Sequence, residues 1–351
     1  MIRDRAVKLP EVDDEKWLLV NEEYRNLVDE FIASQDHSPK TKKQYKSMLR
    51  QFGWFIYKSL NNKAIHKIKK RDFIRFQTFL RDNRKMASAS QATRKAAISS
   101  LCNFIENVVM DDYEEDEVNP YKNFRNFTRG VPKITKNKVY EKVKITRDEY
   151  LMMMETLEDD ENYLGMAWLA VAFNSGARLS EIVQFKSEIV NYPIPKGQNY
   201  IMTHKVRLKG KGEDGKVEEY MMNEEALKYI KLYLDKRGFE NEYIFAKKMH
   251  DSNSHLDSSY GDTLCRNVLS PILGRRVNPH IFKASCITYL LEMGVDIALV
   301  SKYVAHHNDV ATTIAHYDLR EHAEAKNKIF ASISTIEEDE EDEELDDYME
   351  E

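Results

Sequence analysis

The sequence contains few cysteines, and it lacks both a long apolar run and a secretory leader pattern. Its three cysteines, Cys102, Cys265 and Cys286, are an odd number, lie far apart and show no metal-ligand spacing, which is typical of a reduced cytosolic protein. No apolar run approaches the length of a membrane span, and the opening residues MIRDRAVKLPEVDDEKW contain no signal-peptide core. We therefore expect a cytoplasmic protein without a membrane segment, and 351 residues are enough for two domains.

Basic residues are absent from the last fifteen positions, and acidic residues are scarce in a long earlier stretch. Residues 337–351 hold 12 acidic side chains; without them the net charge changes from −6 to +6, because 53 basic residues then face 47 acidic ones. Ser38 to Met110 contains 17 Lys and Arg against three acidic residues. Such a block indicates a polyanion partner, usually nucleic acid; a solvated, Lys-rich helix surface is the alternative. The acidic tail, residues 334–351, is expected to be disordered.

Apolar residues at helical spacing predict a compact all-α domain over residues 19–126, preceded by an N-terminal arm over residues 1–18. Ser38-Pro39 predicts a helix start. Cations in that first turn oppose the helix dipole, so phosphate contact explains them better than stability does. A later helix carries two more basic residues on its outer face. The candidate DNA-binding residues are Lys40, Lys42, Lys43, Lys46, Arg94 and Lys95.

A second domain is expected over residues 145–333, after an extended basic linker over residues 127–144. It opens with a capping box, Thr146 to Glu149, and an apolar helix then ends at Gly176. Residues 199–222 alternate around a Gly-rich turn and predict a β-hairpin. The fold class is therefore mainly α with a small antiparallel β-hairpin. Further helices are expected from Asn278 onward, in a stretch rich in titratable groups at element ends.

Several motifs follow one another in this second half: Gly176-Ala-Arg-Leu-Ser-Glu181, Lys-Gly-Lys-Gly, His280-x-x-Lys283, Leu291-x-x-Gly-Val-Asp296, Val-Ala-His306 and Tyr317. Their order behind a basic helical domain resembles the tyrosine recombinase (phage integrase) family over about residues 20–333. The resemblance implies a helical core-binding domain followed by a catalytic domain. It also implies cutting and rejoining of double-stranded DNA at a specific site through a 3′-phosphotyrosyl link, without a metal or a nucleotide cofactor.

The resemblance assigns a role to each motif. Tyr317 is the expected nucleophile, and Arg178, steadied by Glu181, is the expected bidentate phosphate clamp. Lys211 on the hairpin is the expected general acid, with neighbouring Lys209 as an alternative. His280 is expected to contact the phosphate or to assist proton transfer. The family's C-terminal segment often packs on a neighbouring protomer, so self-association on DNA is expected through residues 327–333.

Two positions depart from the family pattern. The family has a second arginine where this chain has Lys283, which keeps the charge but loses the planar fork. Lys283 is therefore read either as a weakened clamp or as a surface lysine. The usual Leu-Gly-His aligns with His306 from the upstream side and with His307 from the downstream side, so either histidine fits the site.

The residue types also permit less specific interpretations. Arg178 fits a structural ion pair with Glu181, His280 fits a capping or core role, and Tyr317 fits an ordinary half-buried aromatic. The segment from Leu291 to Ala305, with Gly294 in its turn, can be read as a helix-turn-helix. Together with Lys283, it supports an alternative function: a catalytically inactive, DNA-binding regulator on a recombinase fold.

Overall fold

The computed structural model describes residues 11–113, 118–132, 143–208, 216–249 and 251–320. Lys211, residues 327–333 and the acidic tail lie outside this part of the chain. The described residues form two compact units, one built from residues before 142 and one from residues after it. The fold class is the one expected: a helical unit, then a mainly helical unit with a small antiparallel sheet.

The first unit is all helical, and its helices begin where the sequence signals predict. Asn21 caps α2 and Ser38 caps α3, each through a side-chain oxygen that accepts from a backbone N–H of the first turn. Pro39 occupies the first turn of α3. The helices are α1 (Asp14–Leu18), α2 (Glu22–Ser34), α3 (Pro39–Ser59), α4 (Lys70–Thr78) and α5 (Ser88–Asn107), with short 3-10 turns at Ile65–Lys67 and Val109–Asp112 and a π-helical turn at Phe79–Asn83.

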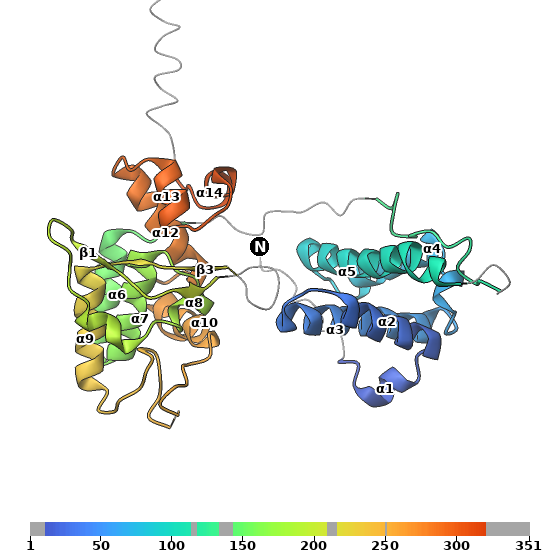
Figure 1. Ribbon diagram of the computed structural model, residues 1–351, viewed down its shortest axis with the longest axis horizontal. Helices are drawn as coiled ribbons and strands as arrows, with labels where there is room; N and C mark the ends of the chain where they lie inside the picture. The colour runs from blue at the N-terminus through green and yellow to red at the C-terminus, as the bar shows by residue number, and fades with distance from the viewer. Residues whose placement is uncertain (1–10, 114–117, 133–142, 209–215, 250, 321–351) are drawn as a thin grey trace, which may run out of the picture. The chain divides into compact units, whose positions relative to one another are not determined.

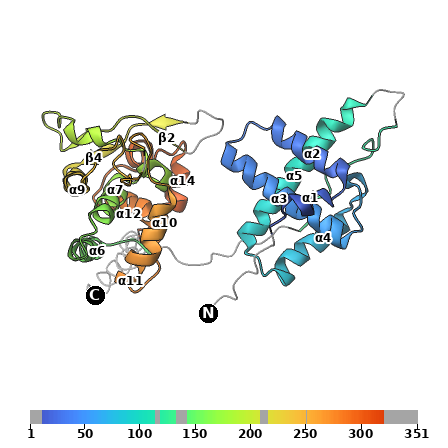
Figure 2. The same ribbon diagram turned by 90° about the horizontal axis from the view of Figure 1, so that it is seen from below.

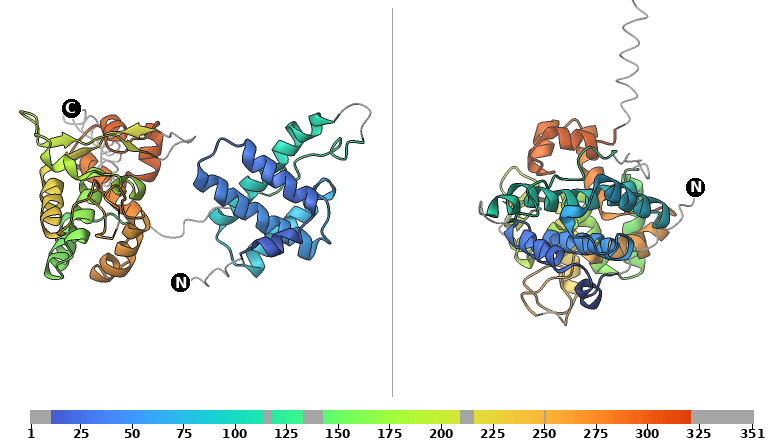
Figure 3. Two further views of the ribbon diagram at one scale, coloured as in Figure 1. Left: turned by 60° about the horizontal axis from the view of Figure 1, so that its bottom comes forward. Right: turned by 90° about the vertical axis from the view of Figure 1, so that its right-hand side faces the viewer.

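The core of the first unit is rich in aromatic side chains. Phe52 of α3 lies at its centre, with ring centroids 5.0 Å from Phe76 and 6.1 Å from Phe127. Helix α5 packs along α2 and α3 (Figures 2 and 3). The core also extends past the boundaries expected for the domain. Trp17 from the expected arm and Phe127 from the expected linker are both buried in it.

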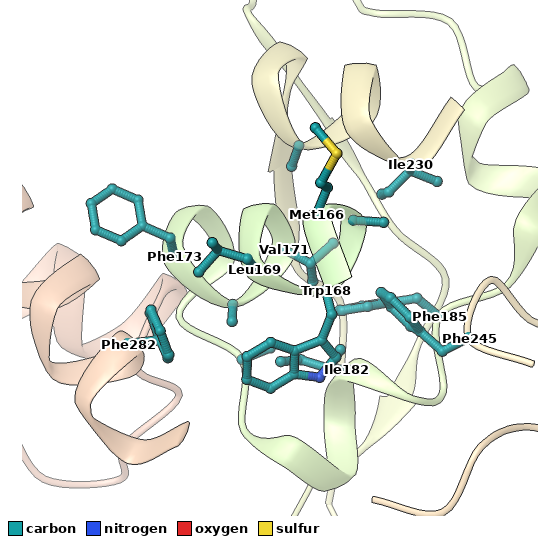
Figure 4. Packing of buried hydrophobic residues seen from close by; sticks show 14 of the residues in the cluster. Met166, Trp168, Leu169, Val171, Phe173, Ile182, Phe185, Ile230, Phe245 and Phe282 are labelled. Carbon is teal, nitrogen blue, oxygen red and sulfur yellow. The ribbon is translucent and has the colours of Figure 1, made fainter. Parts of the chain in front are cut away.

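The second unit is organised around one apolar helix, α7 (Tyr163–Ser175), which is buried on nearly every side. Helix α7 packs against α6, α9 and α12 (Figure 1). Its Trp168 lies close to Phe185, Phe245 and Phe282 (Figure 4). The other elements are α6 (Arg147–Asp159), α8 (Leu179–Ile182), a 3-10 turn Ser187–Asn191, α9 (Glu224–Lys236), α10 (Ser259–Leu264), a π-helical turn Cys265–Leu269 and α11 (Ser270–Ile272).

The expected hairpin is present as two short antiparallel ladders. Strand β1 (Tyr200–Met202) pairs with β4 (Met221–Asn223), and β2 (Val206–Arg207) pairs with β3 (Val217–Glu218). The backbone N–H of Thr203 donates to the carbonyl of Tyr220 at 2.9 Å between the two ladders. The two ladders therefore form one continuous antiparallel pairing; residues 209–215, which include Lys211, lie outside the described residues.

Three helices complete the unit: α12 (Pro279–Glu292), α13 (Ile297–Tyr303) and α14 (Val310–His316). Gly294, with φ +83°, makes the turn between α12 and α13, where residues with a side chain are strained. The hydroxyl of Thr288 on α12 donates to the carbonyl of Tyr317 at 2.9 Å. That bond fixes the end of α14 against α12.

Candidate active site

Arg178 is placed by the way α7 ends. Gly176 follows the helix with φ +63°, a left-handed conformation that favours glycine. Its Cα is also tightly surrounded, because an added Cβ would lie 3.1 Å from Val304. The chain reverses at this residue, and Arg178 then stands at the N-cap position of α8 with an extended backbone. The apolar helix thus sets where this cationic side chain emerges.

Arg178 and Glu181 form a partly buried ion pair, and a tyrosine hydroxyl also donates to the Glu181 carboxylate. Glu181 is fully buried; one carboxylate oxygen accepts from Arg178 Nη1 at 2.9 Å. The other oxygen accepts from the Arg178 backbone N–H at 2.6 Å and from the Tyr220 hydroxyl at 2.6 Å. Burial raises the pKa of the Glu181 carboxyl, but the charges of Arg178 and Lys283 and these hydrogen bonds bring it below its ordinary value. Glu181 is therefore a carboxylate at neutral pH.

The guanidinium of Arg178 lies within electrostatic range of Tyr317. Burial lowers the pKa of Arg178, but the charge of Glu181 and its hydrogen bond outweigh burial, so the pKa lies above its ordinary value. Tyr317 and Tyr220 contribute in the same upward direction. These two rings come from separate parts of the chain, and both approach Arg178.

Lys283 is a buried lysine. Its side chain is only 1% exposed, and Nζ donates to the carbonyl of Gly176 at 2.7 Å. Burial and the nearby charge of Arg178 lower the pKa of Lys283 to about 7. The interpretation of Lys283 as a surface lysine is wrong, because its position on α12 faces the core rather than solvent.

The two neighbouring histidines point to different partners. His306 has φ +52°, is buried, and lies edge-on to Tyr220 with ring centroids 4.4 Å apart. His307 lies 4.7 Å from Tyr317 between ring centroids. The family pattern has glycine before its histidine, and His306 holds the left-handed conformation that glycine favours. The geometry therefore supports the downstream alignment, with His307 beside the tyrosine.

His307 is oriented by a chain of hydroxyl groups. Nδ1 of His307 lies 2.8 Å from the hydroxyl of Thr313, which donates to Ser301 at 2.9 Å. Since the single hydroxyl proton of Thr313 goes to Ser301, Nδ1 is the donor, and Nε2 carries the lone pair. Burial, followed by the charges of Lys283 and Arg178, lowers the pKa of His307 to about 4, so the ring is neutral at neutral pH.

Two candidates remain, His280 and Lys211. His280 stands in the first turn of α12, where its side chain is exposed. Lys211 lies outside the described residues. The sequence did not indicate Tyr220 as a site residue, although a buried tyrosine needs a partner for its hydroxyl. Only the folded hairpin identifies that partner as Glu181.

The basic residues of the first unit differ in how they are held. Lys40, Lys42 and Lys43 make no ion pair with any described residue, whereas Lys46 pairs with Asp29 at 2.7 Å. Arg94 and Lys95, expected on an outer face, are half-buried. Arg94 Nε donates to Gln51 at 3.0 Å, and Lys95 Nζ donates to the carbonyl of Val131 at 3.3 Å.

The described residues hold no group of three or more His, Cys, Asp or Glu side chains arranged to bind a metal ion. None of the described helices combines the length and the apolar character that a membrane span requires.

Sequence comparison identifies the family. Residues 144–323, just over half of the chain, match the model described as the phage integrase family, and residues 24–115 match its N-terminal SAM-like domain. The chain belongs to the phage integrase family. It is 57% identical over 331 residues to an SPbeta prophage-derived recombinase-like protein, YomM, of Bacillus subtilis, covering 94% of this chain and 97% of that protein.

More distant relatives of this phage integrase family member also match over most of its length. A tyrosine recombinase of Thermosipho africanus is 24% identical over 283 residues, covering 79% of this chain and 88% of that protein. The XerH site-specific recombinase in a post-cleavage complex with a palindromic difH substrate has the same fold. Its TM-score is 0.64 at 14% identity, covering 93% of this chain and 99% of that one. The Tn1549 transposon integrase with transposon right-end DNA gives a TM-score of 0.60 at 15% identity, covering 88% and 98%.

Proposed function

We propose that this chain is a site-specific recombinase that cuts and rejoins double-stranded DNA through a 3′-phosphotyrosyl intermediate. The observation that carries the proposal is the meeting of Arg178, His307 and Tyr317. These residues follow α7, α13 and α14, so three separate chain segments supply a cation, a neutral imidazole and a phenol to one place. An ordinary half-buried tyrosine does not require an arginine and a histidine beside it.

In the proposed reaction the Tyr317 oxygen attacks a DNA phosphorus. A bond forms between that oxygen and phosphorus, and the bond from phosphorus to the 5′-oxygen breaks. Arg178, held by Glu181, stabilises the charge on the non-bridging oxygens. Lys211 protonates the departing 5′-oxygen, and rejoining reverses these steps.

His307 is the proposed acceptor of the Tyr317 proton. Its Nε2 is buried and has no hydrogen-bond partner among the described residues. Since Nδ1 already donates to Thr313, Nε2 of the neutral ring can accept a proton but cannot donate one to a phosphate oxygen. This arrangement supports a base role for His307 when an anionic phosphate in the site offsets the charges of Lys283 and Arg178 that help to lower its pKa.

Double-stranded DNA is the proposed partner of both units. Solved proteins that share the fold include recombinases bound to DNA. The first unit offers Lys40, Lys42 and Lys43 at the start of α3, where their charges oppose the helix dipole. We propose that these three lysines contact phosphates; Lys46, Arg94 and Lys95, which have partners within the chain, contribute less.

A second candidate function is a DNA-binding regulator that does not cut. One observation favours it: the Lys283 ammonium is bonded to Gly176, so the site has one fewer cation for a phosphate than the family pattern implies. The helix-turn-helix interpretation gains less support. The exposed face of α13 carries Leu299, 52% exposed, and Tyr303, 48% exposed, and an apolar face is poorly suited to a DNA groove.

The experiment that separates these functions uses a nicked suicide duplex. The duplex is selected for tight binding by the full chain from a randomised pool, and then nicked next to each candidate cleavage position in turn. A covalent protein–DNA species should form with the wild-type chain and should disappear with Tyr317→Phe. The matched control is Tyr303→Phe, since Tyr303 is the more exposed tyrosine of the same segment; this variant should retain the adduct.

The alternative outcomes are equally clear. Tight, sequence-specific binding without any adduct over the whole nick series would favour the regulator. An adduct that survives Tyr317→Phe would reject the proposed nucleophile. Equal affinity for selected and random duplexes at physiological salt would reject a site-specific DNA function of either kind.

A further inference from the structure

Lys283 occupies the position of the family's second arginine, yet its ammonium group points inward. Nζ lies 2.7 Å from the carbonyl oxygen of Gly176, and the side chain is 1% exposed. Gly176 is the left-handed residue that ends α7, two positions before Arg178. The contact joins residues that are 107 positions apart in the sequence. It therefore ties α12 to the turn from which Arg178 emerges.

The surroundings of Lys283 explain how a buried cation is tolerated. The buried carboxylate of Glu181 attracts it, and Arg178 repels it. Cys286, a buried thiol on the same helix, and the neutral rings of His306 and His307 also lie within electrostatic range. A buried ammonium requires both a hydrogen-bond acceptor and an opposite charge. Gly176 supplies the acceptor, and Glu181 supplies the charge.

We propose that Lys283 is a positioning residue for Arg178. Lys283 stabilises the turn at Gly176 and does not contact the DNA phosphate. The inference rests on the proposed function. Lysine suits this role because a single flexible ammonium can reach one carbonyl inside a packed core, whereas the planar guanidinium fork of arginine demands several acceptors. Gly176 has no side chain of its own to restrict its backbone, so the bond from Lys283 stabilises its conformation. The lysine that replaces the family's second arginine therefore supports the first arginine, Arg178, instead of binding phosphate.

The salt dependence of binding tests whether Lys283 contacts a phosphate. Each neutralised phosphate contributes about 0.9 to the slope of log affinity against log salt concentration. Lys283→Met should leave the slope on the selected duplex unchanged, because a positioning residue releases no counterion. The matched control is Lys228→Met, which removes a lysine from the exposed surface of α9. A slope that falls by about 0.9 in Lys283→Met alone would overturn the inference.

The rate of covalent adduct formation tests the positioning role. With the suicide duplex saturated by protein, Lys283→Met should form the adduct about 100-fold more slowly, because a displaced clamp loses alignment with the phosphate. Lys283→Gln retains an N–H donor for Gly176 and should recover about tenfold of that loss. Lys283→Arg should not exceed the wild-type rate. Circular dichroism of each variant confirms that it is folded.

The outcomes separate this inference from the proposed function. If the wild-type chain forms no adduct but binds the duplex, cleavage is rejected and the salt slope alone decides whether Lys283 touches phosphate. If the wild-type chain forms the adduct and Lys283→Met forms it equally fast, cleavage stands and positioning is rejected. A gain of rate in Lys283→Arg would also reject positioning, since it would show a phosphate clamp that arginine restores.

Discussion

The hydroxyl of Tyr220 donates a 2.6 Å hydrogen bond to the carboxylate of Glu181, the same group that holds Arg178. Tyr220 stands between strands β3 and β4, on the hairpin that leads to Lys211. The bond therefore links the hairpin to the cationic clamp through one buried carboxylate. Both residues are fully buried, so the link is protected from competition with water.

Tyr220→Phe tests this link. The substitution removes a hydrogen bond to a buried charge, so the second unit should lose about 2 kcal/mol of unfolding free energy, and adduct formation should slow. Tyr24→Phe in the first unit is the matched control, because the buried Tyr24 hydroxyl donates to a neutral carbonyl, that of Leu49 at 2.9 Å. It should cost about 1 kcal/mol and leave the adduct rate unchanged. Urea unfolding and single-turnover cleavage measure both effects; equal slowing by the two variants would contradict the link.

Glu181 should make the free energy of unfolding depend on pH in the acid range. Its pKa in the folded chain is lowered from the ordinary value of 4.5. The carboxylate therefore contributes stability that is fully present above about pH 4.5 and is lost as pH falls through the lower folded value. Glu181→Gln should cost about 3 kcal/mol at neutral pH, since it leaves Arg178 and Lys283 without their counter-charge. Chemical unfolding at several acid pH values should show this difference shrinking as pH falls below about 4.5; a difference that does not change in that range would contradict the account.

The two histidines should differ in their effect on chemistry. His307→Ala removes the proposed base beside Tyr317 and should slow adduct formation about 100-fold. His306→Gly provides the matched comparison, because glycine adopts the left-handed conformation of this position without strain. It should retain adduct formation at a rate near wild type. The opposite ranking in a single-turnover assay would select the upstream alignment instead.

The lysines at the start of α3 should affect binding and stability in opposite directions. Replacing Lys40, Lys42 and Lys43 together with Ala should weaken binding to all duplexes and lower the salt slope by up to about 0.9 for each of these lysines that neutralises a phosphate. The thermal midpoint should stay equal or rise, because cations are removed from a helix N-terminus. Lys46→Ala, a lysine already paired with Asp29, is the control and should change the slope less. Fluorescence anisotropy over a salt series gives these slopes. An unchanged slope for the triple variant would show that these lysines do not contact DNA phosphates.

Much of the fold could be predicted because its signals are local. Ser38 and Pro39 mark the start of α3, and Gly176 marks the end of α7 through a conformation that glycine favours. The alternating stretch of residues 199–222 does contain the paired strands. Each of these depends on a few neighbouring residues and on the period of the apolar pattern.

The site geometry could not be predicted because it depends on contacts across the sequence. Lys283 and Gly176 are 107 positions apart, and no local pattern indicates that a lysine three residues after a histidine turns inward. His306 and His307 are adjacent, and only the backbone angle of His306 separates their directions. The outer boundaries of the first unit could not be predicted from local sequence signals either, since Trp17 and Phe127 join its core through tertiary packing.

Peptide mapping of the covalent species tests the central claim most directly. Tryptic cleavage after Lys302 and Arg320 gives one peptide that contains both Tyr303 and Tyr317. Fragmentation of that peptide from the suicide-duplex reaction should place the nucleotide remnant on Tyr317. A remnant on Tyr303 or in any other peptide, or no remnant under conditions of saturated specific binding, would contradict the proposal that Tyr317 is the nucleophile.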